Sequence, residues 1–153
     1  MAGDLQRFVD AQDPVYQGVL AELRGAHKTG HWMWFIFPQV AGLGRSEMSR
    51  VYAIESIAEA RAYLDHPVLG TRLRECSRIV AAIPDRSAAA IFGGIDAVKL
   101  RSSMTLFHRA APDEPTFRAV LERFYDGVPD EATDALLRHG HQVENGRSTR
   151  REL

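Results

Sequence analysis

The sequence of 153 residues lacks the features that mark several classes of protein. It has one cysteine, Cys76, which excludes an intramolecular disulfide and a thiolate metal cluster. Its formal net charge is −1, whereas non-specific nucleic-acid binding usually needs a strong basic excess, so we expect no nucleic-acid partner. Its longest apolar run is shorter than the roughly 20 residues of a membrane span, so we expect no membrane partner.

Other chemical signals are also missing. The six histidines are scattered without metal-ligand spacing, so we predict no metal site and no cofactor. Cys76 falls on the apolar side of a predicted helix, where a thiol stays protonated and inert. The start, MAGDLQRFVDAQD, has no basic region followed by an apolar stretch, so we expect no secretory signal and a cytoplasmic location. The oligomeric state is not indicated.

What is present is an apolar and aromatic run, GHWMWFIFPQ, at residues 30–39. Each large side chain that is fully buried stabilises the fold by roughly 1.5–3 kcal/mol, so this run predicts the centre of the core. Its pattern fits either a buried strand or a helix that is apolar all round. We favour a short helix, because no second strand-like run exists to pair with it, and we expect Pro38 to end it.

Apolar residues recur at helical spacing along most of the remaining chain. The residues that we predict to cap helix N-termini are Asp13, Ser46, Ser56, Ser87 and Asp96, the last at the start of a helix over residues 97–108. The pattern predicts an all-α, multihelical globular domain over residues 4–137 with short connections. Residues 138–153 have too few apolar side chains to offset their ordering entropy, so we expect a polar, disordered tail.

Several motifs resemble the domain-of-unknown-function family 1810. They are FVDAQ at 8–12, HWMWFIFPQ at 31–39, GLGRS at 42–46, YAI at 52–54, HPVLGTRL at 66–73 and FGGIDAVKLRSSMTLF at 92–107. The resemblance implies an all-helical, bacterial-type domain and no established activity. Some members carry the name calpastatin, but this chain is rich in core residues and does not look like an inhibitor peptide.

A fainter similarity links the chain to the NADAR family, which handles ADP-ribose-type groups. It rests on the order of a helix with LGTRL and a later helix with the pattern D-x-x-K-x-x-x-S-M-T-L-F. The tryptophan–glycine segments of that family towards the C-terminus are missing here. This similarity implies a ligand that resembles a nucleotide or ADP-ribose.

The helix after Gly94 carries the most informative polar residues. Apolar residues lie on most of its sides, which predicts a largely buried helix whose polar groups need partners. One reading makes Asp96 an N-cap and Lys99 its partner in a surface ion pair. The other, which we favour, is a polar pocket formed by Asp96, Lys99, Ser102, Ser103 and Thr105.

Further candidates flank the apolar run. His31 is either a core histidine bonded to a backbone carbonyl or a general acid/base. Gln39 follows Pro38 and is suited to line a cleft. GLGRS lacks the lysine and the preceding strand of a P-loop, but Arg45, Ser46 and the next helix N-terminus fit an anionic group, and Lys28 lies close enough in sequence to join them.

Two hypotheses follow. In the first, the domain binds or hydrolyses a small anionic ligand, with Asp96 and then His31 as acid/base candidates and Lys28, Gln39, Arg45, Ser46, Lys99 and Ser103 as binding residues. In the second, it is a non-catalytic protein-interaction domain, and the same polar residues cap helices and satisfy the core. A concave site that brings Lys28, Gln39, Asp96 and Lys99 together favours the first.

Overall fold

The computed structural model describes residues 4–140, and its regular structure is helical. The helices are α1 (Gln6–Gln12), α2 (Tyr16–Arg24), α3 (Met33–Ile36), α4 (Glu47–Val51), α5 (Ile57–Asp65), α6 (Leu69–Ala81), α7 (Ala88–Phe92), α8 (Gly94–Ala110) and α9 (Pro115–Tyr125). One more helical segment, here called the final helix, covers residues 131–140. Within the described residues the only extended pairing is a single parallel bridge between Val40 and Ile54. The predicted all-α fold is confirmed.

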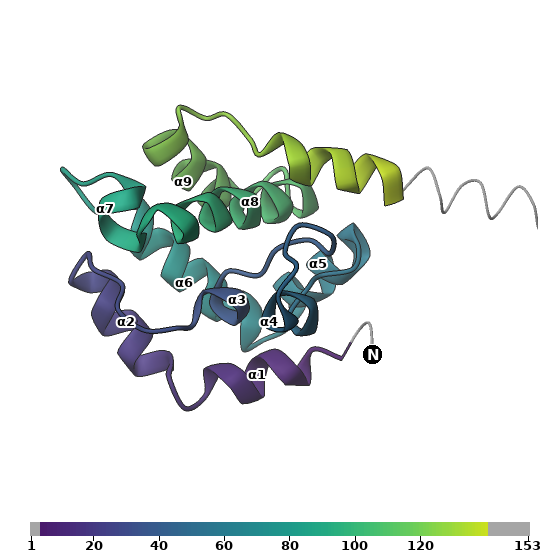
Figure 1. Cartoon of the computed structure of the whole chain (residues 1–153), viewed down its shortest axis with the longest axis horizontal. Coiled ribbons are helices and arrows are strands. Elements are labelled where there is room, and N and C mark those ends of the chain that lie inside the picture. Colours follow the sequence, from purple (N-terminus) through teal and green to yellow (C-terminus); the bar gives the residue numbers. More distant parts are fainter. Residues whose placement is uncertain (1–3, 141–153) are drawn as a thin grey trace, which may run out of the picture.

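The helices form two groups that α5 and α6 join. In Figure 1, α7, α8, α9 and the final helix lie on one side, and α1, α2 and α3 lie on the other. Helix α6 packs against α2 and α9, while α5 packs against α6 and α8. Helix α8 is therefore central, because it contacts α5, α7 and α9 at once.

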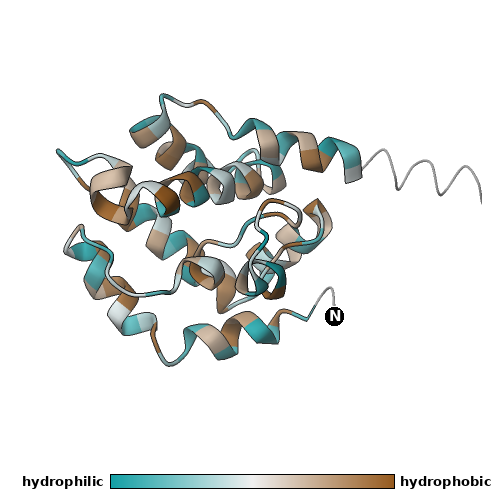
Figure 2. Ribbon diagram, viewed as in Figure 1, coloured by the Kyte–Doolittle hydropathy of each residue, from teal (hydrophilic) through white to brown (hydrophobic). Residues whose placement is uncertain are grey.

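The aromatic run lies inside this arrangement, as predicted. Met33, Phe35 and Ile36 are buried in α3, and Phe37 is buried directly after it. The Phe37 ring packs edge-to-face against that of Phe92 of α7, with ring centroids 6.1 Å apart. Figure 2 shows the corresponding pattern, with brown apolar ribbon turned towards the interior and teal on the outer faces.

Local capping chemistry accounts for three of the predicted helix starts. The hydroxyls of Ser46, Ser56 and Ser87 each accept the backbone N–H three residues ahead, at the start of α4, α5 and α7. At α5 the Glu59 carboxylate also accepts the N–H of Glu55, 3.0 Å away. Such a bond needs only residues of the same turn, so the sequence is sufficient to predict it.

Two predicted caps are wrong. Helix α2 begins at Tyr16 without a side-chain cap, because the Asp13 carboxylate pairs with Arg72 at 2.9 Å instead. Helix α8 begins at Gly94, so Asp96 lies inside its first turn and does not cap it. The N-cap position belongs to Gly93, whose φ of +84° suits glycine and lets the helix start earlier than predicted.

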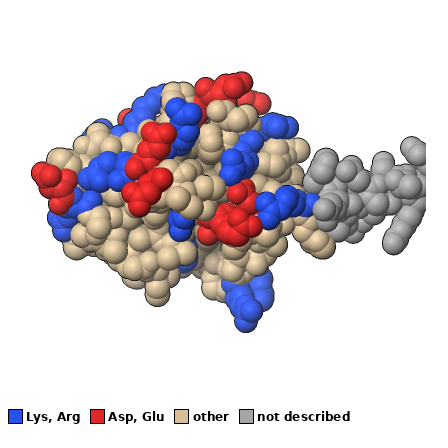
Figure 3. Space-filling view, turned by 90° about the horizontal axis from the view of Figure 1, so that it is seen from above, with Lys and Arg blue, Asp and Glu red and all other residues tan. Residues whose placement is uncertain are grey.

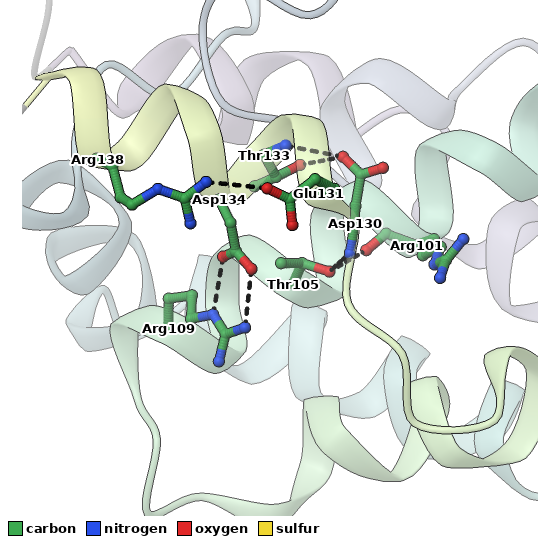
Figure 4. Close-up of polar contacts among 8 residues, drawn as sticks. All are labelled: Arg101, Thr105, Arg109, Asp130, Glu131, Thr133, Asp134 and Arg138. Carbon is green, nitrogen blue, oxygen red and sulfur yellow. Dashed lines mark hydrogen bonds and ion pairs between the residues drawn. The ribbon is translucent and has the colours of Figure 1, made fainter.

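The final helix extends past Leu137, so residues 138–140, which we assigned to the tail, are helical. It is attached to α8 by a bidentate pair between Arg109 and Asp134, with both contacts 2.9 Å long (Figure 4). The rest of the predicted tail lies outside the described residues. Across residues 4–140, no helix combines the length and apolar character needed to span a membrane.

Candidate functional site

Two lysines from distant parts of the chain meet at one carboxylate. The Lys28 ammonium, in the loop after α2, lies 2.8 Å from one oxygen of Asp96. The Lys99 ammonium, one turn along α8, lies 3.7 Å from the other oxygen. The side chain of Lys28 is only 7% exposed and that of Asp96 20%, so this cluster lies at the edge of the core. With two positive charges and one negative charge, the cluster carries a net positive charge.

The loop that carries Lys28 is held in place by Glu22 of α2. One Glu22 carboxylate oxygen accepts the N–H groups of Thr29 and Gly30 and the indole N–H of Trp32, at 2.6, 2.8 and 3.2 Å. Burial raises the pKa of Glu22, but the hydrogen bonds from this loop outweigh burial and hold the pKa below its ordinary value. Glu22 therefore fixes the loop most firmly when it is ionised.

Lys28 is anchored at both ends. Its backbone N–H donates to the Ile91 carbonyl of α7 at 2.8 Å, and its ammonium also donates to the Gly30 carbonyl at 2.5 Å. The same ammonium lies 4.9 Å from the centre of the Trp32 ring. These contacts place the charge of Lys28 beside α8 and leave its side chain little freedom.

Lys99 is held more loosely, and it lies over the second tryptophan. Its ammonium is 5.2 Å from the centre of the Trp34 ring, a cation–π distance. The Trp34 indole nitrogen is buried and has no hydrogen-bond partner among the described residues. A buried polar group without a partner is costly, so this nitrogen needs an explanation.

Lys99 also lines a surface pocket of about 400 Å³, here called the Lys99 pocket. Its polar lining residues are Gln39, Lys99, Ser102 and Asp130, and its other lining residues are Leu43, Gly44, Ile95, Val98 and Ala132. Asp130 is already engaged, because one of its carboxylate oxygens accepts hydrogen bonds from Ser102 and Thr133. Lys99 is thus the cation that this pocket offers to a ligand.

The structure brings some of the predicted site residues together and leaves others apart. Gln39 and Lys99 line the Lys99 pocket, whereas Lys28 and Asp96 do not. Asp96 contacts Lys99 beside the pocket, and Lys28 contacts Asp96 in turn. Ser103 lies one turn beyond Lys99 on α8, where it is fully buried and its hydroxyl has no partner among the described residues.

The remaining predicted site residues lie elsewhere. His31 and Arg45 are exposed and are not among the residues that line the Lys99 pocket. Ser46 is also exposed, and its side chain is used to cap α4. Helix α4 has only five residues, so the dipole at its N-terminus is weak and attracts an anion only weakly.

Sequence reasoning missed Trp34 and Asp130 as site residues and treated Trp34 as core. A compositional signal for the cluster was nevertheless present. Lys28 and Lys99 are the only lysines of the chain, since the other 17 of its 19 basic residues are arginines. Both lysines meet at Asp96, while surface ion pairs such as Arg118–Glu122 use arginine.

Cys76 takes no part in this site. It is fully buried on α6, and burial raises the pKa of its thiol to about 12, which keeps the thiol protonated. Among residues 4–140, no three histidine, cysteine, aspartate or glutamate side chains gather as a metal site would require. On the face seen in Figure 3, basic and acidic side chains are interspersed and do not gather by sign.

Comparison with known proteins establishes the family. Residues 2–137 match the family model described as protein of unknown function, DUF1810. The chain belongs to the DUF1810 family. The resemblance seen in the sequence motifs is thereby confirmed, whereas the similarity to the NADAR family stays a prediction.

One solved structure has the same fold as this DUF1810 chain. It is the crystal structure of the conserved hypothetical protein Rv1873 from Mycobacterium tuberculosis, with 51% sequence identity and a TM-score of 0.88. The match covers 90% of this chain and 99% of the other. No curated protein matches the chain. The comparisons therefore establish the family and the fold.

Proposed function

We propose that this DUF1810 protein binds a small anionic ligand of the nucleotide or ADP-ribose class in the Lys99 pocket. The volume of about 400 Å³ is within the range of roughly 300–1,000 Å³ that small-molecule sites occupy. Lys99 supplies the positive charge for a phosphate. Gln39 supplies a carboxamide, with both a donor and an acceptor, and Ile95 and Val98 supply an apolar wall.

The observation that carries the proposal is the position of Lys99, which lines the pocket and lies 5.2 Å from the centre of the Trp34 ring. The Trp34 indole nitrogen and the hydroxyl of the fully buried Ser103 have no hydrogen-bond partner among residues 4–140, and neither residue lines the pocket. The neighbours of Ser103 behave differently. The Thr105 hydroxyl donates to the Arg101 carbonyl at 2.8 Å, and the Ser102 hydroxyl lies 3.2 Å from both the Val98 carbonyl and the Asp130 carboxylate, between which it shares its one hydrogen. A buried polar group without a partner is costly and calls for an explanation such as a bound molecule, which supports a ligand site beside Lys99.

A hydrolytic step would use Asp96. In the free protein its oxygens face Lys28 at 2.8 Å and Lys99 at 3.7 Å, so Lys99 makes the weaker contact. An anion that draws Lys99 towards the pocket leaves that oxygen of Asp96 free to act as a general base. It would accept a proton from the attacking water as the water oxygen bonds to the phosphorus and the bond to the leaving group breaks. Lys28 stays in place and keeps the carboxylate oriented. His31 has no part in this proposal, because its side chain is exposed, whereas Asp96 is joined to the pocket through its contact with Lys99.

One observation favours the second function, a protein-interaction domain. Ile95 and Val98 lie one turn apart on α8 and are 78% and 62% exposed. Exposed apolar side chains that adjoin one another are typical of protein-binding surfaces. If the protein binds a small anion, Ile95 and Val98 form one wall of its pocket, and binding needs the charge of Lys99. If it binds another protein, the same two side chains form the contact surface, and binding does not need that charge.

A thermal-shift screen of nucleotides, ADP-ribose and ribose 5-phosphate tests the proposal. A ligand present at about 100 times its Kd raises the free energy of unfolding by about 2.7 kcal/mol. We expect the Lys99→Met variant to lose this shift, and the matched variant Arg78→Met, at an exposed arginine of α6, to keep it. If no phosphate compound stabilises the protein, or if Lys99→Met responds like wild type, the ligand site is not at Lys99.

A further inference from the structure

A hollow larger than the Lys99 pocket lies between the first turn of α5 and the final helix. Its volume is about 610 Å³, and its apolar lining includes Val40, Ile57, Leu136 and Leu137. Arg61, one turn along α5 from Ile57, also lines it. A concave apolar site with a few polar groups is the usual form of a small-molecule site. Neither lysine of the Asp96 cluster is among its lining residues.

A second hollow, of about 450 Å³, adjoins the first. The two share Ile57, Arg61 and Leu137, and the second adds Arg109, Asp134 and Arg138 to the lining. Figure 4 shows that two of these arginines are already engaged. Arg109 holds Asp134 through two contacts, and Arg138 lies 2.9 Å from Glu131.

Arg61 differs from the other two arginines in having no carboxylate partner among residues 4–140. Its Nε donates to the Ala110 carbonyl at 3.2 Å, which fixes the plane of the guanidinium. Its two terminal nitrogens make no hydrogen bond within the part of the chain that the structure describes, and they present the fork that pairs with a carboxylate or a phosphate. Arg61 lines both hollows, so a head group bound to it can place its chain in the larger one.

The pairing of the charged side chains selects a ligand with one negative charge. Arg109 is paired with Asp134 and Arg138 with Glu131, whereas Arg61 has no carboxylate partner within residues 4–140. Arg61 therefore offers one positive charge to a ligand. Glu55 also lines the larger hollow and disfavours a second negative charge on the ligand.

We propose that the two joined hollows, here called the Arg61 pocket, form a second binding site, for a small organic monocarboxylate with an apolar chain. The carboxylate binds the free fork of Arg61, and the chain lies against Ile57, Leu136 and Leu137. Burial of the chain supplies most of the affinity, because each methylene group that leaves water adds to it. The charge pair supplies the preference for an acid.

Isothermal titration of the full chain with decanoate, decyl phosphate, 1-decanol and acetate tests this site. We expect saturable binding of decanoate and no saturable binding of acetate. The affinity for decanol should be lower than that for decanoate by at least about tenfold. Arg61→Met should bind decanoate and decanol equally. Arg86→Met, at an exposed arginine outside both hollows, should keep the wild-type preference.

A second variant tests the pocket without touching the arginine. Ala58 is exposed and lines the larger hollow, so Ala58→Phe fills the space at little risk to the fold. This substitution should lower the affinity for decanoate and for decanol together, while Lys99→Met should bind both with wild-type affinity. Equal affinity of the wild type for decanoate and decanol, tighter binding of decyl phosphate than of decanoate, or unchanged binding by Ala58→Phe would each overturn the proposal.

Discussion

Lys28 forms a 2.8 Å ion pair with Asp96 although five helices, α3 to α7, separate the two residues in the sequence. Lys28 is also bound to the carbonyl of Gly30. The pair therefore ties the loop before α3 to the first turn of α8 and decides where Asp96 points. Lys99, on the same helix as Asp96, makes only the longer contact of 3.7 Å.

This difference predicts unequal costs for removing the two lysines. Lys28→Met removes a nearly buried charged hydrogen bond and should lower the free energy of unfolding by about 1.5–3 kcal/mol. Lys99→Met keeps an aliphatic side chain over Trp34, so the free energy of unfolding should change by less than about 1 kcal/mol. Urea denaturation of both variants measures the two costs. Equal costs would show that Lys99 is as structural as Lys28.

Ser102 and Ser103 provide a matched pair of substitutions. Ser102→Ala removes a bond to Asp130 and should cost about 0.5–1.5 kcal/mol. Ser103→Ala removes a buried hydroxyl without a partner and should be neutral or slightly stabilising. Thermal unfolding of both variants gives the comparison. A loss larger for Ser103→Ala than for Ser102→Ala would mean that the Ser103 hydroxyl is satisfied in the free protein.

Glu22 predicts a dependence of stability on pH. Its pKa in the folded protein is below the ordinary value of 4.5, so its contribution is fully present above pH 4.5 and is lost as the pH falls through the lowered pKa. The difference in free energy of unfolding between wild type and Glu22→Gln should therefore shrink on acidification. Denaturation between about pH 6 and pH 3 measures it. A difference that is constant with pH would contradict the assignment.

The aromatic run predicts the most sensitive part of the core. Phe35 is buried and its ring lies 5.3 Å from that of Tyr52, so Phe35→Ala should cost about 3–5 kcal/mol. Trp34 is only half-buried, and Trp34→Ala should cost less. Chemical denaturation of the two variants checks the order. A loss below about 1 kcal/mol at Phe35 would mean that the run does not anchor the core.

The sequence predicts features whose cause is local and misses those whose cause is tertiary. Ser56 and Ser87 cap helices through bonds within one turn, so their residue types are sufficient. Asp96 has the same residue-type signature, yet it does not cap α8. Gly93, whose φ is positive, occupies the N-cap position and starts that helix early, and the Asp96 carboxylate pairs with Lys28 instead.

The candidate site follows the same division. The polar face of α8 is visible in the sequence, because helical spacing relates Asp96, Lys99 and Ser103. The position of Lys28, the orphaned nitrogen of Trp34 and the contribution of Asp130 depend on how α3 and the final helix pack against α8. No periodic pattern encodes that packing, so these parts of the site needed the structure.

The most direct test of the account is isothermal titration of ADP-ribose into wild type, Lys99→Met and Arg78→Met under one buffer condition. The account predicts saturable binding by wild type and Arg78→Met, and a loss of at least about tenfold in affinity for Lys99→Met, because one charge-assisted contact is worth about 1.5–3 kcal/mol. Equal affinity of Lys99→Met and wild type, or no binding of ADP-ribose or any other phosphate compound by wild type, would contradict it.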